Sequence, residues 1–415
     1  MVNSPATELS SRPPLRTRPR NRRQLILAAA ADLFAQKGYS SVAMADIAAA
    51  VAVRPSALYR HYRGKEELLY TVVHDALASV ESSIDRTDLR SIASVLLDHR
   101  ELGLLWQRES RHLEPPLRSR LRGELVAIEQ IVAAMVSERR PDVSRRRCDL
   151  LAWSTMAAVM SVSFQRVRLP RTEYDELLAN IIETIVDVRL PREGAAAPEG
   201  TRTPAGPGRR AALLAAAARL FAARGYHSVT IDDIGAAVGI AGPSVYRHFP
   251  SKLDLMLAIM ADGARQMNSD MARILAEQTG EAAVRSLLAA YSTYSLSNGD
   301  VIELLITETV HLPEPHRSTY LGVQRRYIDT WLRLLGDLDP SWPAGHARVR
   351  LQATFNLIND ISRTAHLRVQ AITAAAVQTM GYALLVPGAA AGPAEQSSGG
   401  IRAEAGDQRG RDVSS

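Results

Sequence analysis

The sequence predicts an all-α protein built from two similar units in tandem. Residues 22–69 align with residues 209–256 without a gap, and about half of the aligned positions are identical. Alanine is abundant and only 5% of residues are aromatic, which favours helices over sheets. Apolar residues recur at i, i+3 and i+4 in both halves, as in residues 125–136 and 327–335, and this is the spacing of amphipathic helices.

Composition excludes several classes of protein. At 415 residues the chain is too long for one hydrophobic core, so more than one domain is expected. The single cysteine, Cys148, excludes a disulfide scaffold and a cysteine-based zinc site and suits a reducing cytoplasm. The uncharged stretch 150–164 is shorter than the roughly 20 apolar residues that span a bilayer. No apolar signal-peptide core precedes Leu25. We therefore expect a soluble, cytoplasmic protein.

Segments rich in proline and glycine divide the chain. The expected parts are a disordered basic arm (1–20), a first helix-turn-helix domain (21–69), a first helical C-terminal domain (70–190), a linker (191–208), a second helix-turn-helix domain (209–256), a second helical C-terminal domain (257–386) and a disordered tail (387–415). The arginines of the arm could reach DNA phosphates or an A·T-rich minor groove. Alternatively, they only keep the chain soluble.

The first repeat predicts a series of short helices, over residues 24–36, 44–51 and 56–62, with a fourth that begins near Lys65. Gly38 supplies the left-handed cap that ends the first helix. Pro55 opens the third helix, where its missing N–H costs nothing. The second repeat has the same signals, with Gly239 in the turn between its second and third helices.

This layout is that of a helix-turn-helix module, whose recognition helix presents small or polar residues to base edges and phosphate-binding groups beside them. The residues at its leading end are Ser56 and Ala57 in copy one, and Pro243 and Ser244 in copy two. Arg54 has no basic counterpart, since copy two has Ala241, so the two modules need not prefer the same half-site. The groups that can bind phosphates are Tyr59, His61, Lys65, Tyr246, His248 and Lys252. The alternative is a module that only serves packing.

Residues 31–68 and 218–255 resemble the N-terminal domain of the tetracycline-repressor (TetR) family, through Leu-Phe-Ala, Gly-Tyr, Asp-Ile and Tyr-Arg-His with a following Lys. The resemblance implies an all-α ligand-binding C-terminal domain, dimerisation through its last two helices, and release of operator DNA when a small molecule binds. By matching position, it gives DNA-contact roles to the six phosphate-binding candidates. It gives a phosphate contact to Thr230, at the start of the second helix.

The first copy departs from the family pattern. Ala43 replaces the threonine, Ala52 replaces the turn glycine, and Pro55 and Ser56 occupy recognition-helix positions. An alanine in the turn is tolerated if its φ is negative and strained otherwise. We expect copy one to bind DNA less tightly than copy two unless the basic arm compensates.

The C-terminal domains carry candidate ligand pockets, in which apolar side chains would surround a few polar groups. The candidates are Trp106, His112, Met135, Trp153, Met156 and Phe164 in half one, and Tyr291, Tyr294, His311, Tyr327, Trp331 and Phe355 in half two. Such side chains at helical spacing more often fill a core. His112 and His311 stand out because both halves keep a Glu-x-x-His-Leu motif, which could equally be an internal i,i+3 pair.

The last two helices of each half, expected over 145–168 with 173–189 and over 347–369 with 372–385, are apolar enough to form a four-helix interface. Dimeric helix-turn-helix proteins place two recognition helices about 34–36 Å apart on palindromic half-sites. We favour an intramolecular pseudo-dimer, whose tether makes docking unimolecular. The alternative is a four-headed homodimer in which like halves of two chains pair.

The expected function is sequence-specific regulation of transcription, by a repressor that a small-molecule effector releases from its operator DNA. An enzyme is disfavoured, because the sequence contains no metal-ligand set, glycine-rich phosphate loop or Ser/His/Asp arrangement, and no cofactor is expected. A second alternative is an architectural protein that binds DNA without effector control, with little sequence preference and a steep salt dependence.

Overall fold

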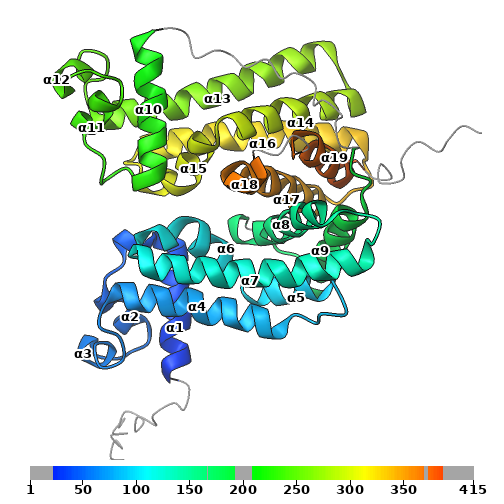
Figure 1. The fold of residues 1–415 in the computed structure, drawn as a ribbon, viewed down its shortest axis with the longest axis horizontal. Coiled ribbons are helices and arrows are strands. Elements are labelled where there is room, and N and C mark those ends of the chain that lie inside the picture. Colours follow the sequence, from blue (N-terminus) through cyan, green and yellow to red (C-terminus); the bar gives the residue numbers. More distant parts are fainter. Residues whose placement is uncertain (1–21, 166, 192–207, 369–372, 387–415) are drawn as a thin grey trace, which may run out of the picture.

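The computed structural model describes residues 22–165, 167–191, 208–368 and 373–386, and all regular elements among them are helices (Figure 1). This confirms the all-α fold class. The expected basic arm, the tail and nearly all of the linker lie outside the described residues.

The helices of the first half differ in length, from 3 to 25 residues. Its α-helices are α1 (Arg22–Lys37), α2 (Met44–Ala50), α3 (Pro55–Leu58), α4 (Lys65–Ser83), α5 (Ser91–Asp98), α6 (Leu102–Leu104), α7 (Pro115–Arg139), α8 (Arg145–Met160) and α9 (Arg171–Asp187). The turn Leu105–Glu109 is π-helical, and the 3-10 turns are Tyr39–Ser41, Ser110–His112 and Ser161–Phe164.

The second half follows the same order with longer central helices. Its helices are α10 (Arg209–Arg224), α11 (Ile231–Ala237), α12 (Gly242–Val245), α13 (Lys252–Glu277), α14 (Gly280–Ser297), α15 (Gly299–Thr307), the 3-10 turn Thr309–His311, α16 (His316–Leu338), α17 (Ala344–Arg363), α18 (Ala365–Arg368) and α19 (Thr373–Leu385). Helix α13 has 26 residues where α4 has 19, and α14 has 18 where α5 has 8.

The two halves meet through the last helices of each. Helices α8 and α9 pack against α17 and α19, and α8 is buried on nearly every side because α7 covers its other face. Asn356 Nδ2 on α17 donates a hydrogen bond to the Ala157 carbonyl on α8, at 2.6 Å. One apolar core continues through this contact from the first half into the second. The expected four-helix interface is therefore formed within a single chain.

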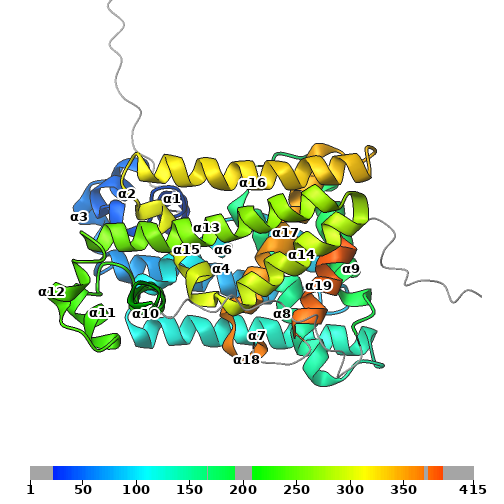
Figure 2. The ribbon, with the colours of Figure 1, turned by 90° about the horizontal axis from the view of Figure 1, so that it is seen from above.

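The two helix-turn-helix units, called here head 1 (α1–α3) and head 2 (α10–α12), lie at the same end of the molecule in both views (Figures 1 and 2). Head 1 shares the main apolar core, whereas head 2 has a separate core that includes Leu304 and Leu312 of the second half. Helices α4 and α13 lead from the heads into the two C-terminal domains.

Candidate nucleic-acid interface

Each head is held by a small apolar core that leaves its third helix at the surface. Phe34, Ile47 and Leu58 are fully buried in head 1, as are the corresponding Phe221, Ile234 and Val245 in head 2. These residues come from all three helices of a head, so their burial fixes the angle between the second and third helices.

The second helix begins differently in the two heads. In head 2 the Thr230 hydroxyl accepts a hydrogen bond from Asp233 N at 3.1 Å, and Asp233 Oδ2 accepts from Thr230 N at 2.8 Å. In head 1 only the second of these bonds exists, from Ala43 N to Asp46 Oδ2 at 2.8 Å, because alanine has no side-chain acceptor. In head 1 the Asp46 N–H therefore has no side-chain acceptor and donates to the Ala43 carbonyl instead, at 3.0 Å.

The turn between the second and third helices requires a positive φ in both heads. Gly239 has φ 72° and Ala52 has φ 52°. An L-residue in this region brings Cβ close to the following carbonyl oxygen, which costs about 1–2 kcal/mol. The sequence allowed an unstrained alanine if φ were negative, and the structure places Ala52 in the strained case.

The third helices are shorter than expected. Helix α3 ends at Leu58 instead of continuing to residue 62, and α12 likewise ends at Val245, each before a turn. They also begin differently. A Cβ at Gly242 would come within 1.7 Å of Asp232 Oδ1, so a larger residue there would force the Asp232 side chain to move. In head 1 the corresponding positions hold Pro55 and Ala45, which do not create this conflict.

Most of the predicted DNA-contact residues are exposed. Tyr59 and Tyr246 are 56% and 53% exposed, which is unusual for large aromatic side chains in this molecule. The other exposed candidates are Arg54, Ser56, His61, Thr230, Pro243 and His248, while Ala57 and Ser244 are partly buried. Arg60 and Arg247, which were not among the predicted DNA contacts, are also exposed next to the tyrosines, and they occupy the same position in both repeats.

The two predicted lysines make intramolecular bonds in this structure. Lys65 Nζ donates to the carbonyls of Tyr39 and Val42, at 2.7 and 2.9 Å. Lys252 Nζ donates to the carbonyls of Tyr226 and Val229, both at 2.8 Å. Each ammonium also lies over a tyrosine ring, and partial burial lowers the pKa of both lysines. Both lysines thus join the start of a long helix to the segment before α2 or α11.

A family model agrees with the geometry of the heads. The model described as "Bacterial regulatory proteins, tetR family" matches residues 26–72 and 213–259, one match across each head. The chain belongs to the TetR family. It is a tandem member, because the family's N-terminal domain occurs twice.

Named relatives match parts of this TetR-family chain. The HTH-type transcriptional activator FasR of Mycolicibacterium smegmatis is 46% identical over 52 residues, which are 12% of this chain and 24% of FasR. The HTH-type transcriptional repressor KstR2 of Rhodococcus jostii is 30% identical over 130 residues, or 31% of this chain and 64% of KstR2. The chain therefore spans less than two thirds of the length of each relative. A TetR-family transcriptional regulator structure from Bordetella parapertussis aligns with a TM-score of 0.40 and 21% identity, over 43% of this chain and 94% of that one.

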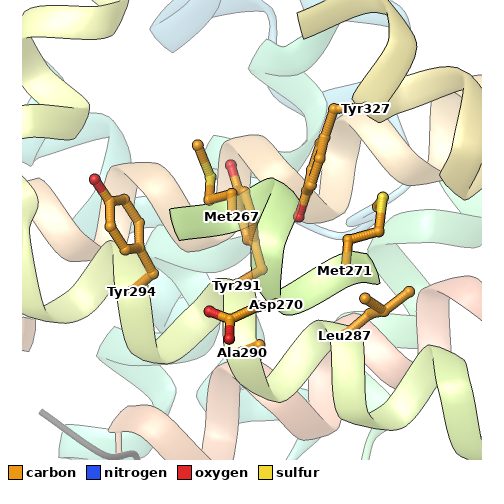
Figure 3. Close-up of a pocket in the computed structure, with 8 residues that line it drawn as sticks. All are labelled: Met267, Asp270, Met271, Leu287, Ala290, Tyr291, Tyr294 and Tyr327. Carbon is orange, nitrogen blue, oxygen red and sulfur yellow. The ribbon is translucent and has the colours of Figure 1, made fainter. Parts of the chain in front are cut away.

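The C-terminal domains of this TetR-family chain contain two small cavities of different chemistry. The cavity of the first half has a volume of about 10 Å³, and its lining is entirely apolar: Leu77, Val80, Ile84, Ile92, Leu96, Leu102, Leu125, Ile128, Val132, Met156 and Met160. The cavity of the second half is also about 10 Å³ and is lined by Met267, Asp270, Met271, Leu287, Ala290, Tyr291, Tyr294 and Tyr327 (Figure 3). Burial raises the pKa of Tyr291 to about 12, so its hydroxyl stays protonated near neutral pH.

The structure brings some of the predicted ligand residues to these cavities and not others. Met156 lines the first cavity, and Tyr291, Tyr294 and Tyr327 line the second. Trp331 is fully buried against Phe355, and Phe164 belongs to the 3-10 turn after α8; neither lines a cavity described here. Trp106, His112 and His311 also lie outside both linings, because their segments face the junction between the halves.

Neither a metal site nor a membrane-spanning helix occurs among the described residues. No cluster of three or more His, Cys, Asp or Glu side chains there could hold a metal ion. No helix in that part of the chain is long and apolar enough to cross a membrane, and the stretch 150–164 forms most of the buried helix α8 and the turn after it.

Proposed function

We propose that this TetR-family chain is a sequence-specific DNA-binding regulator of transcription that carries both recognition segments on one polypeptide. The observation that carries the proposal is the pair of exposed tyrosines, Tyr59 and Tyr246, on two heads at the same end of one molecule. An exposed aromatic hydroxyl beside Arg60 or Arg247 suits phosphate binding next to base contacts. A homodimer of ordinary one-headed chains presents the same two surfaces with two polypeptides.

The expected operator has two unlike half-sites. The leading end of α3 offers Arg54 and Ser56, whereas that of α12 offers Ala241 and Ser244. Arginine beside a base edge favours guanine, which small side chains do not. One chain with two such heads would therefore bind an asymmetric site in one orientation.

We further propose that a small-molecule effector controls DNA binding. Helix α4 runs from Lys65, bonded to head 1, to Leu77 and Val80 in the wall of the first cavity. An alkyl group that enters this apolar cavity would displace that wall and move the start of α4 with it. A ligand that binds this shifted conformer preferentially would draw the population off the operator, and operator and ligand would weaken each other by the same factor.

The direction of regulation is a separate question. Of the two relatives described above, FasR is named an activator and KstR2 a repressor. We propose repression, as expected for a protein that occupies an operator until a ligand releases it. A reporter gene with the selected operator between promoter and start codon tests this directly: deletion of the regulator should raise expression.

The first experiment is selection of operator DNA from a random library by the full chain, followed by light scattering of the complex. We expect one enriched sequence with two unlike half-sites, bound by one chain. Tyr246→Ala should abolish the footprint over one half-site. Two chains on one site would contradict the intramolecular pseudo-dimer. Binding without sequence enrichment and with a steep salt dependence would favour the architectural alternative.

The effector is tested with n-alkyl carboxylates of increasing chain length, because the first cavity is apolar. Release of the operator at concentrations that also raise the thermal unfolding midpoint would support effector control. A Val80→Leu variant, which extends a wall side chain into the cavity by one methylene, should respond less. If no chain length changes either quantity, the proposal for this ligand class is wrong.

A further inference from the structure

A short segment of the first half, Arg108–His112, holds the end of α1 in head 1. Glu109 is fully buried and its Oε2 accepts a hydrogen bond from Tyr39 N, at 2.7 Å. Arg108 forms an ion pair with Glu109 and donates to the carbonyl of Ala35, at 2.6 Å. The carboxylate therefore holds the chain where it leaves α1, and its charge is balanced by its own neighbour.

The same segment reaches across to the second half. Glu308 is buried, and its Oε1 accepts a hydrogen bond from Tyr226 N at 3.0 Å, just after α10 of head 2. The guanidinium that pairs with Glu308 comes from Arg111 of the first half. Arg111 also donates to the Thr307 carbonyl at 3.2 Å. Burial by itself raises the pKa of Glu308, but the Arg111 hydrogen bond and charge outweigh it, so the net pKa is lowered.

The two carboxylates are equivalent, but the two arginines are not. Glu109 and Glu308 occupy the same position of the Glu-x-x-His-Leu motif. In the second half Thr307 takes the place of Arg108, and no arginine stands where the first half has Arg111, because that position is Val310. The first half thus supplies the cation for both buried carboxylates. A buried carboxylate left without a cation is strongly destabilising.

Contact also runs in the opposite direction, from the second half to head 1. A Cβ at Gly38, the residue that ends α1, would lie 3.4 Å from His311 Cε1. His311 meets the edge of His112 with ring centroids 6.3 Å apart, and His112 stacks on Tyr39 at 4.9 Å. The turn after α1 therefore packs against side chains of both halves.

We propose that Arg111 is a positioning residue that couples head 2 to the first half and selects the pairing of unlike halves. It thereby fixes the distance between operator half-sites at which both heads can bind. Two second halves paired with each other would bring together two buried Glu308 carboxylates without Arg111. Two first halves would bring two Arg111 side chains to carboxylates already paired with Arg108. Of the three pairings, only the unlike one gives each of Glu109 and Glu308 an arginine partner and leaves neither Arg108 nor Arg111 without a carboxylate.

The inference rests on the proposed function, and its test uses operator DNA selected by the wild-type full chain. Affinity is measured by fluorescence anisotropy on a series of operators whose half-sites are brought two base pairs closer or moved up to four farther apart. Wild-type protein should show one sharp optimum. Arg111→Met should weaken binding at that optimum by about tenfold or more and flatten the profile. Arg111→Lys, which keeps the charge but not the two-point contact, should lie between the two.

The matched control is Arg350→Met. Arg350 also crosses between the halves, to Asn180, but at the four-helix interface away from the heads. Its substitution should change the affinity by less than about twofold and leave the spacing optimum unchanged. The double variant Arg111→Met/Glu308→Gln removes the unpaired charge. It should regain much of the thermal stability lost in Arg111→Met while its spacing profile stays flat.

The outcomes separate this inference from the proposed function. If the wild-type chain enriches no DNA sequence, the proposed function fails. If it enriches an operator but Arg111→Met retains the sharp optimum, Arg111 does not set the spacing. If Arg111→Met weakens binding by one factor at every spacing and to an isolated half-site, its role is only structural and the inference is wrong.

Discussion

Ala52 and Gly239 occupy the same turn in the two heads and both have positive φ, 52° and 72°. Only glycine adopts this conformation at no steric cost. Head 1 therefore contains a strained turn where head 2 does not. The strain lies directly before α3, so it affects the segment that we propose to contact DNA.

Ala52→Gly should stabilise head 1. Relief of the steric strain, about 1–2 kcal/mol, exceeds the added entropy of the unfolded glycine, so a net gain of about 0.5–1 kcal/mol is expected. Hydrogen exchange of the α2 and α3 amides in the full chain measures this gain in stability. Gly239→Ala is the matched reverse change and should accelerate exchange in head 2. Unchanged exchange in both variants would show that the turn adapts without strain.

Ala43→Thr should add the missing cap to α2, and Thr230→Ala should remove the existing one from α11. A lost N-cap hydrogen bond costs about 1 kcal/mol, so the two substitutions are expected to change head stability by that amount in opposite directions. Hydrogen exchange of the first-turn amides of each helix measures this change in stability. Equal exchange in wild-type protein and Thr230→Ala would mean that Asp233 alone secures the helix start.

Lys252 and Tyr246 should respond differently to substitution, although both are predicted DNA contacts. Lys252→Met leaves the carbonyls of Tyr226 and Val229 without their donor, which should cost about 1–3 kcal/mol of head stability. Tyr246→Ala removes an exposed side chain and should change stability by less than about 0.5 kcal/mol while it weakens operator binding. Thermal unfolding and anisotropy on each variant separate the roles. A Lys252→Met protein of unchanged stability with lost DNA affinity would assign Lys252 to DNA contact alone.

Low pH should destabilise the junction between the two halves, because His112 becomes protonated. Burial, assisted by the charge of Arg111, lowers the pKa of His112 from 6.5 to about 4, against the opposing charges of Glu109 and Glu308. The unfolded state therefore binds more protons than the folded state between these pH values. Stability is fully present above pH 6.5 and falls as the pH drops toward 4. The loss should be about 1–3 kcal/mol.

His112→Gln should reduce this pH dependence, because glutamine does not titrate. Thermal midpoints of the full chain from pH 7.5 to 4.5 test it, with His366→Gln as a control for a histidine at a different contact between the halves. Identical pH profiles for wild type and His112→Gln would show that His112 is not the titrating group.

The tandem repeat, the all-α class, the two heads and the apolar last helices of each half could all be predicted from the sequence, whereas pairing within one chain or between two chains stayed open. These features follow from spacings along the chain: apolar residues at helical period, glycine after the first helix, and long apolar helices at the end of each half. Local spacing fixes local structure because each helix buries a face that its own sequence defines. The third helices end earlier than expected, at Leu58 and Val245, and both of these residues are fully buried in the cores of the heads.

The partners of the charged residues at the junction could not be predicted from the sequence. The Glu-x-x-His motifs were candidates for ligand binding or for an internal pair. The structure places His112 Nε2 4.0 Å from Glu109 Oε2, as in an internal pair, and it also places both motifs between heads and halves. Arg111 and Glu308 are far apart in sequence, and no periodicity indicates that one neutralises the other. Likewise, the φ of Ala52 and the carbonyl partners of Lys65 depend on how α2 and α4 pack. The effect of a charge or of a positive φ depends on the groups around it. Three-dimensional packing brings those groups together from distant parts of the chain, so local sequence does not reveal them.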